Sequence, residues 1–295
     1  MANVSARRLA TLLAITPGIG GKTLVRILAR LELLSHSPDE FLSLSPEALQ
    51  ESYGIAKKAA ASICAASKGW QKEASALELK LMEKNVRLIT AADAHFPARL
   101  DEFDSQSPSA LFCYGNLKLL DLPTFTVLSS RNTSRRGLEW IEKWTEEGVF
   151  QGEVLVTGHD RPEYQRAAVV PLRWGSPRIL CFDRGIFPVL GEELNQEPFR
   201  AARLWRYEFD PKTDLAISPF RPESHFIGVN NQVRDRLVAG LSLRLDGVEV
   251  SQGGNMEKNL RLGIKAKRKV RILDRSEAAD NLTKLGAELV ACESL

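Results

Sequence analysis

The chain has 295 residues, of which 44% are hydrophobic and 26% are charged, proportions that are ordinary for a soluble globular protein. No apolar run approaches the ~20 residues of a membrane-spanning helix, and no signal-peptide cleavage site follows the first helical pattern, so we expect a cytoplasmic protein. The four cysteines are too dispersed for a C-x-x-C metal site and too few for a disulfide framework. The net charge of +3 is mildly basic and permits a polyanionic partner without requiring one.

The glycine-rich stretch ITPGIGGKTLVRIL, residues 15–28, ends its glycines in Gly-Lys-Thr, as a phosphate-binding P-loop does. A P-loop has four residues between its first glycine and this tripeptide, whereas only two separate Gly18 from Gly21. Apolar residues at helical spacing precede and follow the glycines, so the pattern predicts helix, turn, helix. Two interpretations remain: a helix-hairpin-helix that contacts nucleic-acid phosphate through Gly18, Gly20 and Lys22, or a plain helical hairpin that needs glycines to turn.

The pattern of apolar, turn-forming and polar residues divides the chain into three segments. Residues 1–70 are predicted to form an all-helical domain, in which SPDE and SPE each supply a serine cap and a proline at the first helical position. Residues 71–116 are predicted to be a connector that is rich in turns. In residues 117–295, short apolar runs alternate with segments of helical periodicity, which predicts βαβ units around a mostly parallel sheet. We therefore expect an α/β protein with an N-terminal helical domain.

Polar motifs follow three of the predicted strands directly: SSR after FTVL, TGHD after EVLV, and GGN after GVEVS. Ligands of an open parallel sheet bind outside the carboxyl ends of its strands, so we expect these motifs to line one edge. Hydroxyl groups, backbone N–H groups and a guanidinium would then face phosphate oxygens. The expected phosphate ligands at this edge are Ser130, Arg131, Ser134, Gly253, Gly254 and Asn255. The alternative for Arg131 is a buried ion pair.

Two further groups of basic residues are candidates for the same ligand. Arg234 and Arg236 begin the predicted helix RDRLVAGLS but do not share a helix face, so we expect one to bind phosphate and the other to pair with an acid such as Glu249. Residues 256–275 carry eight basic and two acidic side chains, a surplus of six positive charges that suits a polyanion. Secondary contacts are expected from Lys265, Lys267 and Arg268, and the alternative is a solvated helix face.

No catalytic constellation is evident. The four histidines have no serine, cysteine or metal-ligand partner at a motif spacing, so we expect no catalytic residues, no metal ligands and no cofactor. An enzymatic alternative rests on Asp160 and Glu163, which follow TGH and could hydrolyse an N-glycosidic bond of a nucleotide in a Rossmann-like pocket.

Four stretches, in this order along the chain, resemble motifs of the DprA/Smf family of DNA-processing proteins. TPGIGGKTLVRIL is similar to the helix-hairpin-helix-like opening of the family, and LITAADAHFPARLDEFDSQSPSALFCYGN to its connector. VLSSRNTS is similar to its Val-Gly-Ser-Arg-x-x-Ser motif, and RDRLVAGLS to its Arg-Asn-Arg-Ile-Ile-Ala-Gly-Leu-Ser motif. The resemblance implies a helical domain of the helix-hairpin-helix or SAM-like kind joined to an extended Rossmann-like domain. It also implies a non-enzymatic, homodimeric protein that binds single-stranded DNA and helps to load a RecA-type recombinase.

The chain also departs from the family pattern. Ser129 replaces the glycine of Val-Gly-Ser-Arg, TGHDRPEYQRAA keeps little of the next family motif beyond Gly158, and GGNM replaces a Ser-Gly-Ser/Thr loop. We also expect no C-terminal winged helix of the kind that many members carry. These departures leave two alternatives open. One is a regulatory or antitoxin component of a defence system that acts on a toxin-like partner protein, and the other is a nucleotide-binding or nucleotide-hydrolysing enzyme of the related superfamily.

Overall fold

The computed structural model describes residues 4–292, and the chain divides into two compact units. The first unit comprises the chain up to Asp101 together with residues 105–112. The second comprises residues 102–104 together with the chain from Cys113 onward. Within the described part of the chain, no helix is both long and apolar enough to cross a membrane.

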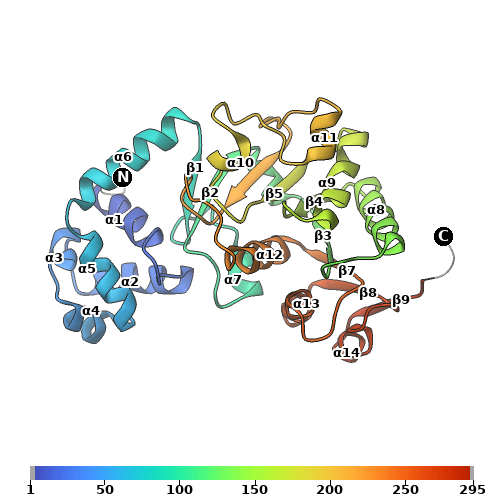
Figure 1. Ribbon diagram of the computed structural model, residues 1–295. Coiled ribbons are helices and arrows are strands. Elements are labelled where there is room, and N and C mark those ends of the chain that lie inside the picture. The colour runs from blue at the N-terminus through green and yellow to red at the C-terminus, as the bar shows by residue number, and fades with distance from the viewer. Residues whose placement is uncertain (1–3, 293–295) are drawn as a thin grey trace. The chain divides into compact units, whose positions relative to one another are not determined.

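The first unit is built mainly from short helices (Figure 1). Its elements are α1 (Val4–Ala14), α2 (Gly21–Leu33), α3 (Pro38–Leu42), α4 (Pro46–Tyr53), α5 (Lys57–Ala66), α6 (Trp70–Glu83) and β1 (Arg87–Thr90). The serine caps are formed as expected: the Ser37 hydroxyl accepts the Glu40 N–H, and the Glu40 carboxylate accepts the Ser37 N–H in return. The Ser45 hydroxyl accepts the Ala48 N–H at the start of α4.

The glycine-rich segment forms a tight turn between two helices, α1 and α2. Gly18 has a φ of 88°, which favours glycine. At Gly21, a Cβ atom would lie only 2.8 Å from the Ser107 hydroxyl oxygen and 3.0 Å from the Pro108 carbonyl oxygen, so only glycine fits this close approach. The Gly21 N–H donates to the Ser107 carbonyl over 3.0 Å. The segment is therefore helix, turn, helix, and no strand leads into it as one would into a P-loop.

The second unit is an α/β layer structure. Helix α7 (Ala98–Phe103) and strand β2 (Ala110–Gly115) lie where the chain passes between the units. The strands that follow are β3 (Thr124–Ser129), β4 (Val154–Thr157), β5 (Arg178–Cys181), β6 (Leu215–Ser218), β7 (Arg244–Val248), β8 (Lys269–Leu273) and β9 (Glu288–Val290). The helices are η1 (Leu117–Asp121), α8 (Arg135–Phe150), α9 (Pro162–Trp174), α10 (Phe187–Leu190), α11 (Arg200–Leu204), α12 (Asn230–Leu241), α13 (Asn255–Lys265) and α14 (Ala279–Lys284).

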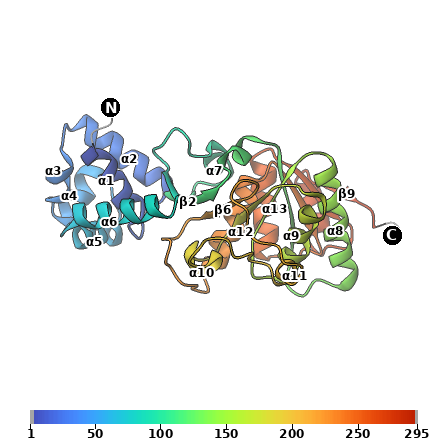
Figure 2. The same cartoon turned by 90° about the horizontal axis from the view of Figure 1, so that it is seen from above.

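The order of strands across the sheet of this unit is β2-β6-β5-β4-β3-β7-β8-β9. The pairings from β6 to β3 and from β3 to β9 are parallel. Helices α8 and α9 pack on one face and α12 and α13 on the other, as Figure 1 and the turned view in Figure 2 show. The predicted α/β class with a helical N-terminal part and a mostly parallel, Rossmann-like sheet is confirmed.

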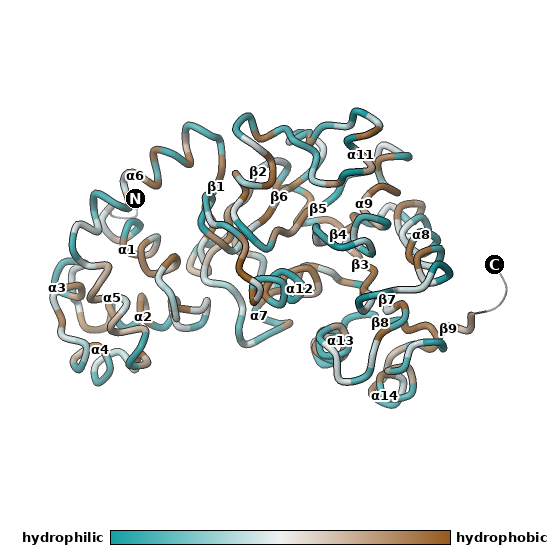
Figure 3. The backbone as a smooth tube through the Cα atoms, in the orientation of Figure 1, coloured by the Kyte–Doolittle hydropathy of each residue, from teal (hydrophilic) through white to brown (hydrophobic). Residues whose placement is uncertain are grey.

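Covering both faces buries the central strands completely. Every residue of β3, β4, β5 and β6 is buried, and Figure 3 shows β3 and β5 mainly in the hydrophobic colours. Such strands read as continuous apolar runs rather than as an alternating pattern. Helix α8 lies so close to β3 that a Cβ at Gly148 would approach the Phe125 ring to 2.4 Å. This rigid layer fixes the positions at which the loops leave the strands.

Candidate nucleic-acid interface

The order of strands reverses between β3 and β7. From β3 the chain continues through β4, β5 and β6 on one side, and it then returns to place β7, β8 and β9 on the other. Such a switch point leaves a crevice at the carboxyl ends of the strands, where doubly wound sheets bind their ligands. The two loops that leave this point are residues 130–134 and 249–254. They are joined by a hydrogen bond of 2.8 Å from the Ser251 N–H to the Ser130 hydroxyl oxygen.

Arg131 lies exposed in the first of these loops. No described residue forms an ion pair or a hydrogen bond with its guanidinium. It borders a polar depression of about 330 Å³, to which the second loop and the segment after β8 also contribute. The lining residues are Arg131, Asn132, Thr133, Glu249, Val250, Ser251, Arg275 and Glu277. Arg275 is also exposed and unpaired among the residues that the structure describes, so two guanidinium groups border one depression.

Ser134 is expected to donate hydrogen bonds to phosphate, but its N–H and its hydroxyl both donate within the protein. Its N–H donates to the Glu249 carboxylate over 2.7 Å, and its hydroxyl donates to the same carboxylate. The hydroxyl oxygen caps α8 by accepting the Gly137 N–H over 3.0 Å. The carboxylate thus lies at the N-terminus of α8, where the helix dipole favours a negative charge. A phosphate could bind at this helix end only by displacing Glu249.

The predicted ligands of the second loop are also engaged within the protein. The Gly253 N–H donates to the Glu257 carboxylate, which also accepts hydrogen bonds from Arg261. The Asn255 side-chain amide donates to Asp235 over 3.0 Å. Gly254 is the N-cap residue of α13 and has no side chain to offer. The expectation that this turn presents free donors is therefore not supported by its hydrogen bonds.

Arg234 is completely buried and cannot reach a ligand. Its guanidinium lies 2.9 Å from carboxylate oxygens of both Asp183 and Asp235, and it donates to the His159 carbonyl over 2.8 Å. This corrects the expectation that it contacts phosphate. Arg236, the other arginine of the motif, is paired with Asp104 over 3.1 Å, so both arginines have acidic partners.

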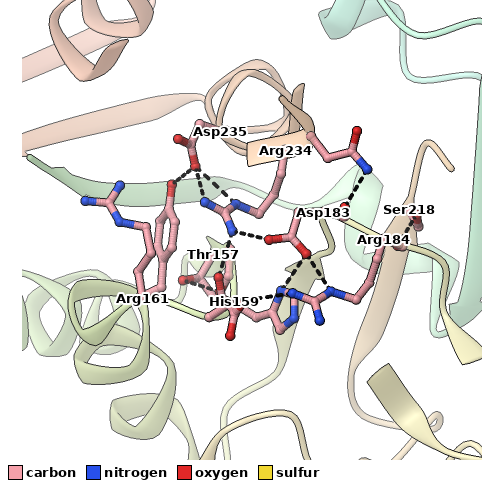
Figure 4. Close-up of polar contacts among 12 residues, drawn as sticks. Thr157, His159, Arg161, Asp183, Arg184, Ser218, Arg234 and Asp235 are labelled. Atoms are coloured by element: carbon pink, nitrogen blue, oxygen red, sulfur yellow. Dashed lines mark hydrogen bonds and ion pairs between the residues drawn. The ribbon is translucent and has the colours of Figure 1, made fainter. Parts of the chain in front are cut away.

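A polar cluster lies at the ends of β4 and β5 (Figure 4), and it includes two residues that the sequence analysis did not single out, Asp183 and Arg184. Asp183 and Arg184 follow β5 in CFDRG just as Ser130 and Arg131 follow β3, and this placement is the signal that could have revealed them. The Asp183 carboxylate accepts hydrogen bonds from Arg184 and Arg234, each over 2.9 Å. Asp183 is therefore the acceptor that holds the two guanidinium groups of this cluster together. Burial lowers the pKa of the neighbouring His159 to about 4, so its imidazole is neutral at pH 7.

The chain is similar to known proteins in part of its sequence and in its fold. Residues 87–173 match the family model described as DNA recombination-mediator protein A. The resemblance to the DprA/Smf family is confirmed. The structure is similar to the X-ray structure of DNA processing protein A (DprA) from Streptococcus pneumoniae, with a TM-score of 0.67 and 19% identity, over 96% of this chain and 94% of that one.

It is also similar to DNA processing protein A from Helicobacter pylori, whose structure was reported for its unique single-stranded DNA binding mode. That likeness has a TM-score of 0.52 and 19% identity, over 69% of this chain and 90% of that one. At these identities the two structures bear on the fold alone. No curated protein matches the chain.

The basic segment of residues 256–275 has fewer unpaired positive charges than its sequence suggests. Arg261, Arg268 and Arg271 are each paired with an acid. Arg268, predicted as a secondary contact, keeps only 9% of its side chain exposed and lies 3.2 Å from Glu102. Lys265 and Lys267 are exposed and make no ion pair within the described residues, so they stay candidates for contacting a polyanion.

The remaining predicted residues belong to the DprA/Smf-like opening in the first unit. Gly18 and Lys22 are exposed, and Gly20 is the N-cap residue of α2 without a side-chain hydrogen bond. Lys22 has no ion-pair partner among residues 4–292. A role for these three residues in DNA binding stays a prediction.

Proposed function

We propose that this protein binds single-stranded DNA through the phosphate backbone and acts as a DNA-processing protein of the recombination-mediator type. The observation that carries the proposal is the exposed guanidinium of Arg131 at the topological switch point, which has no partner among residues 4–292. The match of residues 87–173 to a family of recombination mediators supports it. So does the fold shared with the Helicobacter pylori protein, whose reported structure concerns single-stranded DNA binding.

The chemistry of the depression suits a phosphate group. Arg131 and Arg275 can each donate two parallel N–H bonds to phosphate oxygens, which is stronger and more directional than a contact from lysine. The Ser130 hydroxyl oxygen accepts the Ser251 N–H, and its own hydrogen has no acceptor among the described residues, so it can donate to a ligand. These donors read the backbone and not the bases, which predicts binding without sequence preference.

The two glutamates that line the depression reduce its positive charge to different extents. The Glu249 charge is offset by two donors of Ser134 and by the N-terminus of α8. Glu277 accepts the Gln252 N–H over 3.3 Å and stays exposed. We infer that Glu249 positions the loop that carries Arg131, whereas Glu277 moderates the affinity for an anion.

Salt dependence tests the proposal directly. Fluorescence anisotropy with mixed-sequence single-stranded oligonucleotides should give a log affinity that falls linearly with log salt concentration, because phosphate contacts release counterions. Two oligonucleotides of equal length and unrelated sequence should bind with similar affinity. An absence of binding even at low salt would refute the proposal.

The resemblance also underlies our proposal that the protein acts as a homodimer that helps to load a RecA-type recombinase onto DNA. Sedimentation of the purified chain over a range of concentrations tests the first part. The second part is tested by the rate of RecA filament formation on single-stranded DNA that is coated by a single-strand-binding protein. The chain should increase that rate, and a rate that does not change would contradict the mediator role.

A further inference from the structure

Three potential metal ligands meet at the carboxyl ends of β4 and β5, apart from the Arg131 depression. They are a ring nitrogen of His159 and carboxylate oxygens of Asp160 and Asp183, and these atoms all lie within 4.8 Å of one another. His159 and Asp183 are buried, whereas Asp160 is exposed. The cluster can therefore bind an ion within the protein while one side stays open to solvent. The DNA-binding proposal makes no use of it.

The His159 ring presents an unsatisfied nitrogen to this cluster. Its side chain is only 8% exposed, and Nδ1 has no hydrogen-bond partner in the part of the chain that the structure describes. The nearest acidic atom is Asp183 Oδ1, which lies 3.8 Å from it and is too far away for a hydrogen bond. The Phe182 ring packs edge-on against the imidazole and restricts its orientation. Buried polar atoms without a partner are uncommon and call for an explanation, of which an absent ion is one.

The two carboxylates already face a common cation, the guanidinium of Arg184. Its Nε lies 2.9 Å from Asp183 Oδ1 (Figure 4). Its Nη2 lies 2.7 Å from Asp160 Oδ2. The Arg184 side chain is partly exposed, so it can move out toward water without unfolding the cluster. The second nearby guanidinium, that of Arg234, contacts both Asp183 and Asp235. The three carboxylates of Asp160, Asp183 and Asp235 therefore face two guanidinium groups, which leaves one negative charge in excess.

We propose that His159, Asp160 and Asp183 bind a divalent first-row transition-metal ion, which takes the place of the Arg184 guanidinium between the two carboxylates. An imidazole ligand favours Zn²⁺ or Co²⁺ over Mg²⁺ and Ca²⁺, which prefer oxygen ligands only. Ligand atoms around tetrahedral Zn²⁺ lie about 3.4 Å apart, so the 3.8 Å between His159 and Asp183 needs only a small contraction. Three protein ligands leave a coordination position for water on the exposed Asp160 side.

The test uses the full-length, tag-free protein with Zn²⁺ or Co²⁺ as the probe. Isothermal titration should show one equivalent of ion bound with micromolar affinity or better, and bound Co²⁺ should show the absorption bands of a low-coordinate site. His159→Asn and Asp160→Asn should each weaken binding at least about tenfold, because each removes one ligand. Arg184→Gln should strengthen binding by about tenfold, because the guanidinium that contacts both Asp160 and Asp183 is then removed.

His225→Asn is the matched control, because His225 is exposed and outside the cluster. It should leave the dissociation constant unchanged. Thermal melting reports whether each variant is folded. If His159→Asn does not fold, Asp160→Asn decides the matter, because Asp160 is exposed. Absence of binding to the wild type, unchanged affinity in Asp160→Asn, or weaker binding in Arg184→Gln would each overturn the proposal.

Discussion

Glu249 and Ser134 join the two loops of the topological switch point through two hydrogen bonds, although they are 115 residues apart in the sequence. Glu249 has a φ of 47°, a left-handed conformation that is uncommon outside glycine, and a Cβ at Gly137 would lie 2.6 Å from its carboxylate carbon. The conformation of Glu249 and the glycine at 137 therefore both serve this contact. It fixes the start of α8 and, with it, the loop that carries Arg131.

Replacing Glu249 with Gln is expected to lower the free energy of unfolding by about 1.5 kcal/mol, because hydrogen bonds to a charged acceptor are lost. Ser134→Ala should cost about 1 kcal/mol through loss of the helix cap. Since both changes weaken the contact between the Ser134 hydroxyl and the Glu249 carboxylate, the double variant should lose less than the sum of the two. Urea denaturation of the four proteins measures this, with Glu277→Gln as a control of small effect. Fully additive losses would contradict the coupling.

Arg131→Ala is expected to weaken binding of single-stranded DNA about ten- to a hundredfold, the loss that follows from a charge-assisted contact of about 1.5–3 kcal/mol. Arg131→Lys should recover only part of it, because it keeps the charge and loses the bidentate geometry. Lys267→Ala should have a much smaller effect, since an exposed charge is screened. Anisotropy titrations at one salt concentration compare them.

Arg200→Ala is a matched control for Arg131, because Arg200 is an exposed arginine on α11, which follows neither β3 nor β7. Thermal melting should show all four variants to be folded. Wild-type affinity in a well-folded Arg131→Ala protein would move the binding site away from the switch point.

Arg234→Met is expected to destabilise the second unit by about 3–5 kcal/mol, because it leaves the buried Asp235 without its arginine and the buried Asp183 with Arg184 alone. Arg236→Ala, two residues along the same helix, should cost less than about 1 kcal/mol, since its side chain is 42% exposed. Urea denaturation of both variants gives the comparison. A stable Arg234→Met protein that has lost only DNA affinity would restore Arg234 as a ligand.

The fold class could be predicted because its signals are local. Runs such as FTVLSS and RILCFD are short and mainly apolar, as expected of strands that are buried on both faces. The caps at Ser37 and Ser45 depend on residues three positions away, so a short window of sequence is enough to detect them. The turn at Gly18 follows equally from neighbouring residues.

The ligands of the site could not be predicted as well, because their availability depends on partners that are distant in the sequence. Arg234 pairs with Asp183, 51 residues away, and Arg268 pairs with Glu102, 166 residues away. A motif shows which groups leave the strand ends, but only the tertiary structure shows which of them are already neutralised. Arg131 differs from the other predicted arginines in having no such partner among the described residues.

His159 is expected to make the stability of the protein depend on pH. Burial lowers its pKa to about 4, below its ordinary value of about 6.5, so as the pH falls this histidine takes up a proton in the unfolded chain before it does so in the folded one. The free energy of unfolding should therefore be unaffected by His159 above pH 6.5. Between pH 6.5 and about 4 it should fall by at most about 1.4 kcal/mol per pH unit. The His159→Asn variant should lack this part of the slope. Denaturation at a series of pH values, with His225→Asn as control, measures the difference. Parallel curves for wild type and His159→Asn would contradict the assignment.

The glycine-rich turn of residues 18–22 is expected to bind neither ATP nor GTP. A P-loop directs consecutive N–H groups at a phosphate, whereas here the Gly21 N–H donates to Ser107 and the Ile19 N–H donates to Thr16. Isothermal titration with either magnesium nucleotide should show no binding, and micromolar affinity that is lost in Lys22→Ala would prove the argument wrong.

The same Lys22→Ala variant decides between the two interpretations of the turn, with Lys58→Ala as a control at another exposed lysine of the first unit. A helix-hairpin-helix contacts phosphate through its turn, so Lys22→Ala should then lower the affinity for single-stranded DNA and reduce the slope of log affinity against log salt by about one. Lys58→Ala should change neither quantity. If Lys22→Ala also left both unchanged, the turn would be a plain hairpin, whose glycines are explained by the contact of Gly21 with Ser107 and Pro108.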